Sequence, residues 1–168
     1  LGEHTGLPQN RYRRRVAMAR IREAEGDLHA ALDLLHEAER VYTSDFSPSV
    51  RPIAAMKTRV WIAQGRLVEA LGWARERSLS PEDDLSYLRE FEHITLARVL
   101  LAEYKIDHAE RSIHEAMALL QRLLKAAEEG GRVGSAIEIL VLQSLGHHAQ
   151  GDIGAALISL ERALTPAE

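Results

Sequence analysis

The sequence contains no cysteine, only 5% aromatic residues and no long apolar run among its 168 residues. Without cysteine the chain cannot form disulfides, thiolate metal sites or a cysteine nucleophile. No apolar run approaches the roughly 18 to 20 residues of a membrane helix, so no membrane association is expected. A formal net charge of −4 argues against direct binding of nucleic acid, although 18 of the 21 basic residues are arginine. The first residues resemble neither a signal peptide nor a natural start, which suggests a fragment of a longer protein. The absence of cysteine is compatible with an intracellular protein, and a cytoplasmic location is expected.

The prolines and glycines mark joints between helices. All five prolines fall between, or in the first turn of, segments whose apolar residues recur every three or four positions: Pro8, Pro48, Pro52, Pro81 and Pro166. The segment Ser80–Asp83 predicts a helix start, with serine as the N-cap and proline at the first helical position. Glu129–Gly131 predicts a helix end. Because alternating strand-like runs are absent, the sequence predicts an all-α fold.

An eight-residue pattern returns along the chain. The stretches 19–26, 58–65 and 97–104 match at a constant spacing of 39 residues, and a weaker copy, 144–151, follows 47 residues after the third. Each copy is followed by an aliphatic residue and then an alanine: Leu28 and Ala31, Leu67 and Ala70, Ile106 and Ala109, Ile153 and Ala156. Alanine at such positions lets two helix axes approach closely, so each copy predicts a helical hairpin.

Four hairpins predict an α-solenoid of about four helix-turn-helix repeats and about eight antiparallel helices in a single domain. The repeats are expected at about 9–44, 48–79, 81–130 and 132–166. One hairpin cannot bury both of its apolar faces, and stacking the hairpins completes the core. The third repeat is eight residues longer, and its second helix is expected to be lengthened because apolar residues from Ile106 to Leu123 continue one stripe.

These residues resemble two known patterns. The glycine with alanines five and twelve positions later resembles the tetratricopeptide (TPR) repeat, although the period of 39 exceeds the usual length of about 34. The stretches Val50–Gly65, Leu85–His93 and Glu129–Leu140 look like the helical-repeat region of the large ATP-dependent LuxR-family regulators of the MalT type. In that family the region lies between a nucleotide-binding module and a helix-turn-helix, and it is the sensor that receives an inducer and releases self-inhibition.

Motifs for catalysis, metals and cofactors are absent from the sequence. None of the three lysines follows a glycine, so no phosphate-binding loop is present and no cofactor is expected in this chain. His36 and His114 begin His-Glu-x-x-His patterns, but the fifth residues are Arg40 and Ala118, so neither is a zinc helix. Ser135 lacks the glycines of a nucleophile elbow and is interpreted as an N-cap. The sequence therefore predicts neither a metal site nor a catalytic residue, and the chain is not expected to be an enzyme.

The candidate binding residues are arginines at one position of the repeat. Arg20, Arg59 and Arg98 each stand six residues before the joint, and stacking would align them along the concave face that TPR repeats use. Guanidinium groups suit carboxylate, phosphate or peptide acceptors. An internal network is the alternative, with arginines paired to acids such as Glu23 and Glu138. Glu23 and Tyr87 complete the candidate set of five. Tyr87 is a candidate stacking residue whose hydroxyl needs a partner, and packing between repeats is the alternative role of its ring.

The resemblance implies a non-catalytic sensor and interaction module of a bacterial transcription regulator. Its expected partners are a small-molecule effector, or a protein or peptide, bound on the concave face, together with the other domains of the same regulator. A TPR-like scaffold that binds a peptide or helix without sensing a small molecule is the competing hypothesis.

Overall fold

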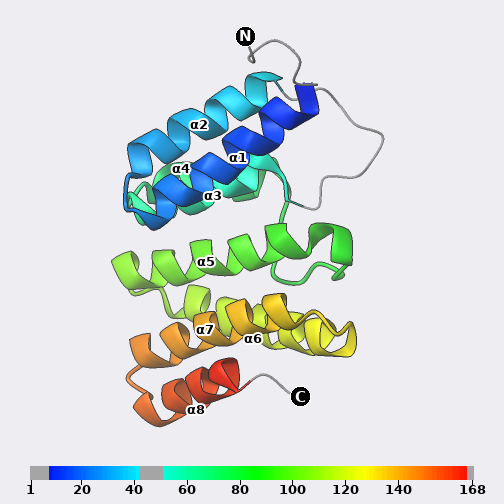
Figure 1. Ribbon diagram of the computed structural model, residues 1–168. Coiled ribbons are helices and arrows are strands. Elements are labelled where there is room, and N and C mark those ends of the chain that lie inside the picture. Colours follow the sequence, from blue (N-terminus) through cyan, green and yellow to red (C-terminus); the bar gives the residue numbers. More distant parts are fainter. Residues whose placement is uncertain (1–7, 42–50, 166–168) are drawn as a thin grey trace. The chain divides into compact units, whose positions relative to one another are not determined.

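The computed structural model describes residues 8–41 and 51–165. Over these residues it contains eight α-helices, one 3-10 helix and no strand (Figure 1). The helices are α1 (Pro8–Ala24), α2 (Leu28–Val41), α3 (Ile53–Ala63), α4 (Leu67–Glu76), η1 (Tyr87–Arg89), α5 (Glu90–Asp107), α6 (Glu110–Glu129), α7 (Val133–Ala149) and α8 (Ile153–Leu164). The predicted all-α class, an α-solenoid of helical hairpins, is confirmed. The expected joints at Pro48 and Pro166 lie outside the described residues.

The chain forms two compact units that part after Trp73, within α4. Unit 1 (1–73) holds α1, α2, α3 and most of α4. Unit 2 (74–168) holds the end of α4, then η1 and the four helices α5 to α8. Each unit is described by itself below.

The joint of each hairpin is a residue in the left-handed region of the backbone. Gly26, Gly65 and Gly151 have φ angles of 82°, 75° and 82°, and the second helix begins two residues after each of them. Glycine adopts this conformation without a steric penalty, which explains its place in the repeated pattern.

The third joint departs from the predicted register. The left-handed residue there is His108, with φ of 52°, which lies four residues beyond the position aligned with the glycines. Helix α5 therefore runs one turn further than expected and ends at Asp107. The expectation that Ile106 and Ala109 begin the second helix was wrong, because Ile106 lies in α5 and Ala109 is the N-cap of α6. Ile113, five residues after His108, takes the close-contact position and is fully buried.

The core of unit 1 confirms the role of the repeated alanines. Helices α1 and α2 pack side by side and run antiparallel, and α3 packs against α2 (Figure 1). Ala31 and Ala38 on α2 are fully buried and Ala19 on α1 is nearly so. Outside this core, the Lys57 ammonium on α3 binds the Glu39 carboxylate on α2 at 3.1 Å.

The core of unit 2 is larger because α6 is the longest helix. Helices α5 to α8 each pack against the next along the chain (Figure 1). Five aliphatic residues of α6 are at most 2% exposed: Ile113, Leu119, Leu120, Leu123 and Leu124. Each such side chain contributes roughly 1.5–3 kcal/mol through removal of apolar surface from water.

On α7, Gly146 lies so close to the Met117 sulfur of α6 that a Cβ there would displace the methionine side chain. The expected lengthening of the second helix of this repeat is confirmed.

The segment before α5 corrects the predicted helix start at Ser80. Residues 80–86 form a turn and a loop, and the chain becomes helical only at η1 and α5. The Ser80 hydroxyl accepts a hydrogen bond from the Glu82 amide, and the Asp83 carboxylate accepts one from the Ser80 amide at 3.0 Å. Both side chains that could cap a helix therefore stabilise a local turn instead.

Two side chains from neighbouring helices hold this loop. The Arg122 guanidinium of α6 donates to the carbonyls of Pro81 and Asp83, at 2.7 and 2.6 Å. His93 of α5 is fully buried, and its ring nitrogens lie 3.1 Å from the Arg89 carbonyl and 3.1 Å from the Asp83 carboxylate. The loop is thus tied to α5 and α6 by polar contacts.

Candidate interaction sites

Helix α1 is the most basic helix of unit 1. This helix carries six arginines and one acidic residue, Glu23. Two of the arginines are used within the fold: Arg15 binds Glu37 of α2 at 2.8 Å, and Arg22 binds Glu25 at 2.8 Å. The other four are exposed: Arg11, Arg13, Arg14 and Arg20. They form the "α1 face" together with Ala17, Met18 and Ile21, which are also exposed.

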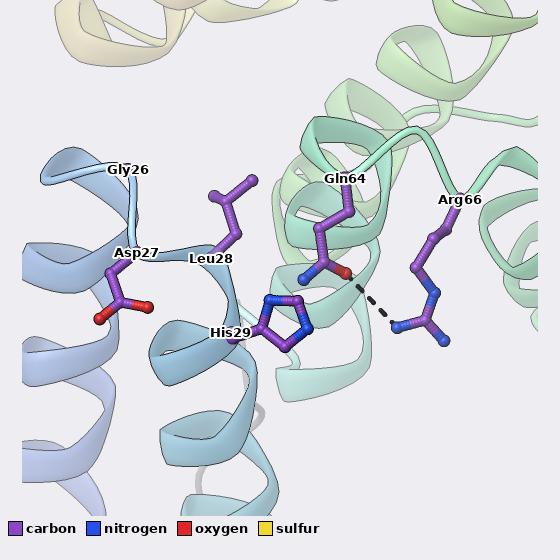
Figure 2. Close-up of a pocket in the computed structure, with 6 residues that line it drawn as sticks. All are labelled: Gly26, Asp27, Leu28, His29, Gln64 and Arg66. Carbon is purple, nitrogen blue, oxygen red and sulfur yellow. Dashed lines mark hydrogen bonds between the residues drawn. The ribbon is translucent and has the colours of Figure 1, made fainter.

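A hollow of about 440 Å³ lies between the two hairpin joints of unit 1. Figure 2 shows its six residues, Gly26, Asp27, Leu28 and His29 on one side and Gln64 and Arg66 on the other, with the His29 ring pointing toward Gln64. The Arg66 guanidinium donates to Glu69 at 2.8 Å and to Gln64 at 3.4 Å, and it lies 5.7 Å from the Trp61 ring centroid. The hydrogen bond from Arg66 to Glu69 is the main cause that holds the pKa of the Glu69 carboxyl below its usual range.

Asp27, Gln64 and Arg66 in the hollow already have hydrogen-bond partners. Asp27 accepts a hydrogen bond from the Ala30 amide at 3.1 Å, as an N-cap of α2 does. His29 is exposed, and no hydrogen bond of its ring is present among the described residues. The hollow therefore offers one imidazole to a ligand, with little enclosed apolar surface to bind it.

In unit 2 some arginines connect helices. Arg98 of α5 donates two hydrogen bonds to Glu138 of α7, at 2.9 and 3.2 Å. Arg132, at the α6–α7 turn, binds the buried Glu90 carboxylate at 2.7 Å, and the Ser135 hydroxyl donates to the same carboxylate at 2.6 Å. Ser135 is the third residue of α7, so its interpretation as an N-cap was wrong.

The five candidate residues from the sequence lie in different surroundings. Arg20 and Glu23 are exposed on α1, and Arg59 is half-buried on α3. Arg98 forms the pair with Glu138 that the alternative hypothesis predicted. Tyr87 is 59% exposed in η1, with the Arg132 guanidinium 5.8 Å from its ring centroid. Arg20 and Arg59 belong to unit 1 and Arg98 to unit 2, so the alignment of the three stays a prediction.

Sequence reasoning missed the α1 face. Its signal was present in the arginines between positions 11 and 22, but attention to one repeat position selected Arg20 and left the others out. Within the described ranges no three potential ligands come together as a metal site. No described helix is both long enough and apolar enough to cross a bilayer.

The repeated helical hairpins with glycine joints and buried alanines define a TPR-like helical-repeat protein. The family model of the MalT-like TPR region matches residues 1–168. The chain belongs to this family. Neither the curated proteins nor the solved structures compared with the chain match it.

Proposed function

We propose that this chain is a sensor and interaction module of a bacterial LuxR-family regulator of the MalT type, in the cytoplasm. The match of the MalT-like TPR region over the whole chain carries the proposal. An effector or partner that prefers one arrangement of the repeats shifts the population of the active regulator by the difference in its affinities for the two states. The other domains of that regulator are the proposed recipients of this change.

The proposed binding residues are Arg20, Arg59, Arg98, Glu23 and Tyr87. Arg20, Glu23 and Tyr87 are exposed, which supports direct contact with a ligand. The Arg98 side chain is 35% exposed although it pairs with Glu138, and Glu138 uses two of the five N–H donors of the guanidinium. A repeat scaffold that binds a peptide or helix without a small-molecule effector is the second candidate function, and the exposed α1 face favours it.

Binding measurements on the purified chain separate the two candidates. If the chain is a sensor, we expect thermal-shift screening and calorimetry to find a metabolite that binds it saturably. The Arg59→Ala variant should bind that metabolite more weakly. Arg75→Ala is the matched control, because Arg75 is exposed near the end of α4, outside the proposed set. If no metabolite binds, and the same preparation captures a partner protein tightly, the sensor hypothesis is rejected and the scaffold hypothesis remains.

A further inference from the structure

The α1 face combines positive charge with apolar surface in a regular pattern. Arg14, Met18 and Ile21 stand at positions i, i+4 and i+7, and Arg13, Ala17 and Arg20 form a parallel row at the same spacing. Residues at these spacings lie side by side on a helix surface. Met18 is 37% exposed and Ile21 is 51% exposed. A short apolar strip is therefore bordered by guanidinium groups.

Within the described residues, these arginines take no part in the packing of α1 against α2. Contact with α2 is made by the opposite side of α1, where Ala19 is buried and Arg15 binds Glu37. No ion pair or hydrogen bond of the side chains of Arg11, Arg13, Arg14 and Arg20 occurs among the residues that the structure describes. Their removal is therefore not expected to disturb packing in unit 1.

The same arginines oppose formation of the isolated helix. The first turn of α1 has no acidic residue, and Arg11 lies near the helix N-terminus, where the helix dipole disfavours positive charge. Arg11 and Arg14 are also like charges three positions apart, which repel. A negatively charged partner would relieve both effects, and among the described residues no carboxylate forms an ion pair with Arg11 or Arg14.

We propose that the α1 face binds an acidic amphipathic helix of a partner protein. Carboxylates of that helix would meet Arg11, Arg13, Arg14 and Arg20, and its apolar residues, at helical spacing, would cover Met18 and Ile21. The face from Arg11 to Ile21 spans about 15 Å, so a partner helix of about three turns matches it. The proposal concerns this surface and stands whether or not the chain senses a metabolite.

Apolar side chains favour a protein partner over nucleic acid. A phosphate backbone would bind the arginines but would leave Met18 and Ile21 without a complementary surface. The chain as a whole is also negatively charged, at −4, which opposes association with DNA or RNA. An acidic helix with an apolar stripe satisfies both components of the face.

The direct test uses fluorescence anisotropy with a labelled amphipathic peptide of about 14 residues, built from glutamate and leucine at helical spacing. Two other ligands are measured in parallel: a peptide of the same composition with the stripe scrambled, and a short DNA duplex. We expect the amphipathic peptide to bind at least about tenfold more tightly than either. Equal binding of the scrambled peptide, tighter binding of DNA, or no binding of the amphipathic peptide would overturn the proposal.

Variants of the chain locate the binding surface. Arg13→Ala with Arg14→Ala is expected to weaken peptide binding about tenfold and to reduce its salt dependence. Met18→Ala with Ile21→Ala should weaken binding about fivefold while leaving the salt dependence unchanged. Arg75→Ala is the control and should bind as the parent does; circular dichroism checks that each variant keeps its helices. Unchanged affinity in both double variants, or self-association of the chain that depends on Arg14, would contradict the proposed partner.

Discussion

Several arginines of the two units lie in contrasting surroundings. In unit 1 four arginines of α1 extend into solvent without a described partner. In unit 2 Arg98 and Arg132 link helices, and Arg122 holds a loop through two carbonyl groups. Arginine composition alone therefore does not reveal whether a repeat protein binds a partner or stabilises its own stack.

Arg20 and Arg98 show why the difference arises. They occupy the same position of the repeat, but of the two only Arg98 forms an ion pair among the described residues, with Glu138 on α7. In the repeat alignment the residue of unit 1 that corresponds to Glu138 is Pro52, which cannot accept an ion pair from a side chain. Arg98 therefore makes an internal contact, whereas Arg20 at the same repeat position is exposed.

The largest expected effect comes from removing the arginines around Glu92. This carboxylate is only 3% exposed and binds Arg77 at 2.8 Å and Arg89 at 3.2 Å. Changing both arginines to methionine leaves a buried, unpaired charge, and we expect the free energy of unfolding to fall by about 3–5 kcal/mol. Urea denaturation measures the change.

The matched control for this double variant lies in unit 1. Arg13→Met with Arg14→Met removes two exposed arginines and should change the free energy of unfolding by less than about 0.5 kcal/mol. Similar losses in the two double variants would show that the units do not differ in their use of arginine.

A smaller loss is expected when Arg122 is changed to methionine. The substitution leaves the carbonyls of Pro81 and Asp83 without their charged donor, and we expect a loss of about 1–2 kcal/mol. Limited proteolysis should also cut residues 80–86 faster. Arg111→Met is the control, because the Arg111 side chain is 87% exposed and, among the described residues, its one ion pair is with Glu115 of its own helix. If both variants behave alike, Arg122 does not hold the loop.

Asp83 gives the same loop a dependence on pH. A hydrogen bond from the Ser80 amide is the main cause that holds the pKa of the Asp83 carboxyl below its usual value of about 3.9, and His93 and Arg89 act in the same direction. Since the folded state then binds fewer protons than the unfolded state, this contribution is present above the ordinary aspartate pKa and is lost as pH falls through the lower folded value. Urea denaturation at several pH values should show that the difference between the parent and Asp83→Asn shrinks below about pH 4. A difference that is constant with pH would exclude this role of the carboxylate.

The repeated sequence pattern predicted the hairpins because its glycines indicate a backbone conformation and its alanines indicate close contact between helices. A left-handed joint requires glycine at Gly26 and Gly65, and a close helix contact requires a small residue such as Ala31. The same logic failed at His108, since no glycine marks that joint, and at Ser80, whose hydroxyl caps a local turn instead of a helix.

Side-chain partners were harder to predict than backbone features. The pair of Arg98 with Glu138 joins residues 40 positions apart, and it was one of two open alternatives at the level of sequence. The α1 face required knowing which arginines α2 engages, since Arg15 and Arg14 are neighbours in the chain but point to different sides of the helix. Exposure of a charged residue depends on the tertiary neighbours, which composition does not encode.

The smallest expected effect compares the joints of the two units. His108 is a non-glycine residue at φ of 52°, which costs about 1–2 kcal/mol, whereas Gly65 adopts its φ of 75° freely. Replacing His108 by glycine removes this strain. Two effects oppose the gain in stability: the entropy of the unfolded backbone rises, which costs about 0.5–1 kcal/mol, and the edge contact with Tyr104 is lost. We therefore expect a net gain of no more than about 0.5 kcal/mol for His108→Gly, and a loss of about 1 kcal/mol for Gly65→Ala. Thermal unfolding of the two variants should shift the midpoint in opposite directions, and a clear loss in His108→Gly would show that the Tyr104 contact outweighs the strain.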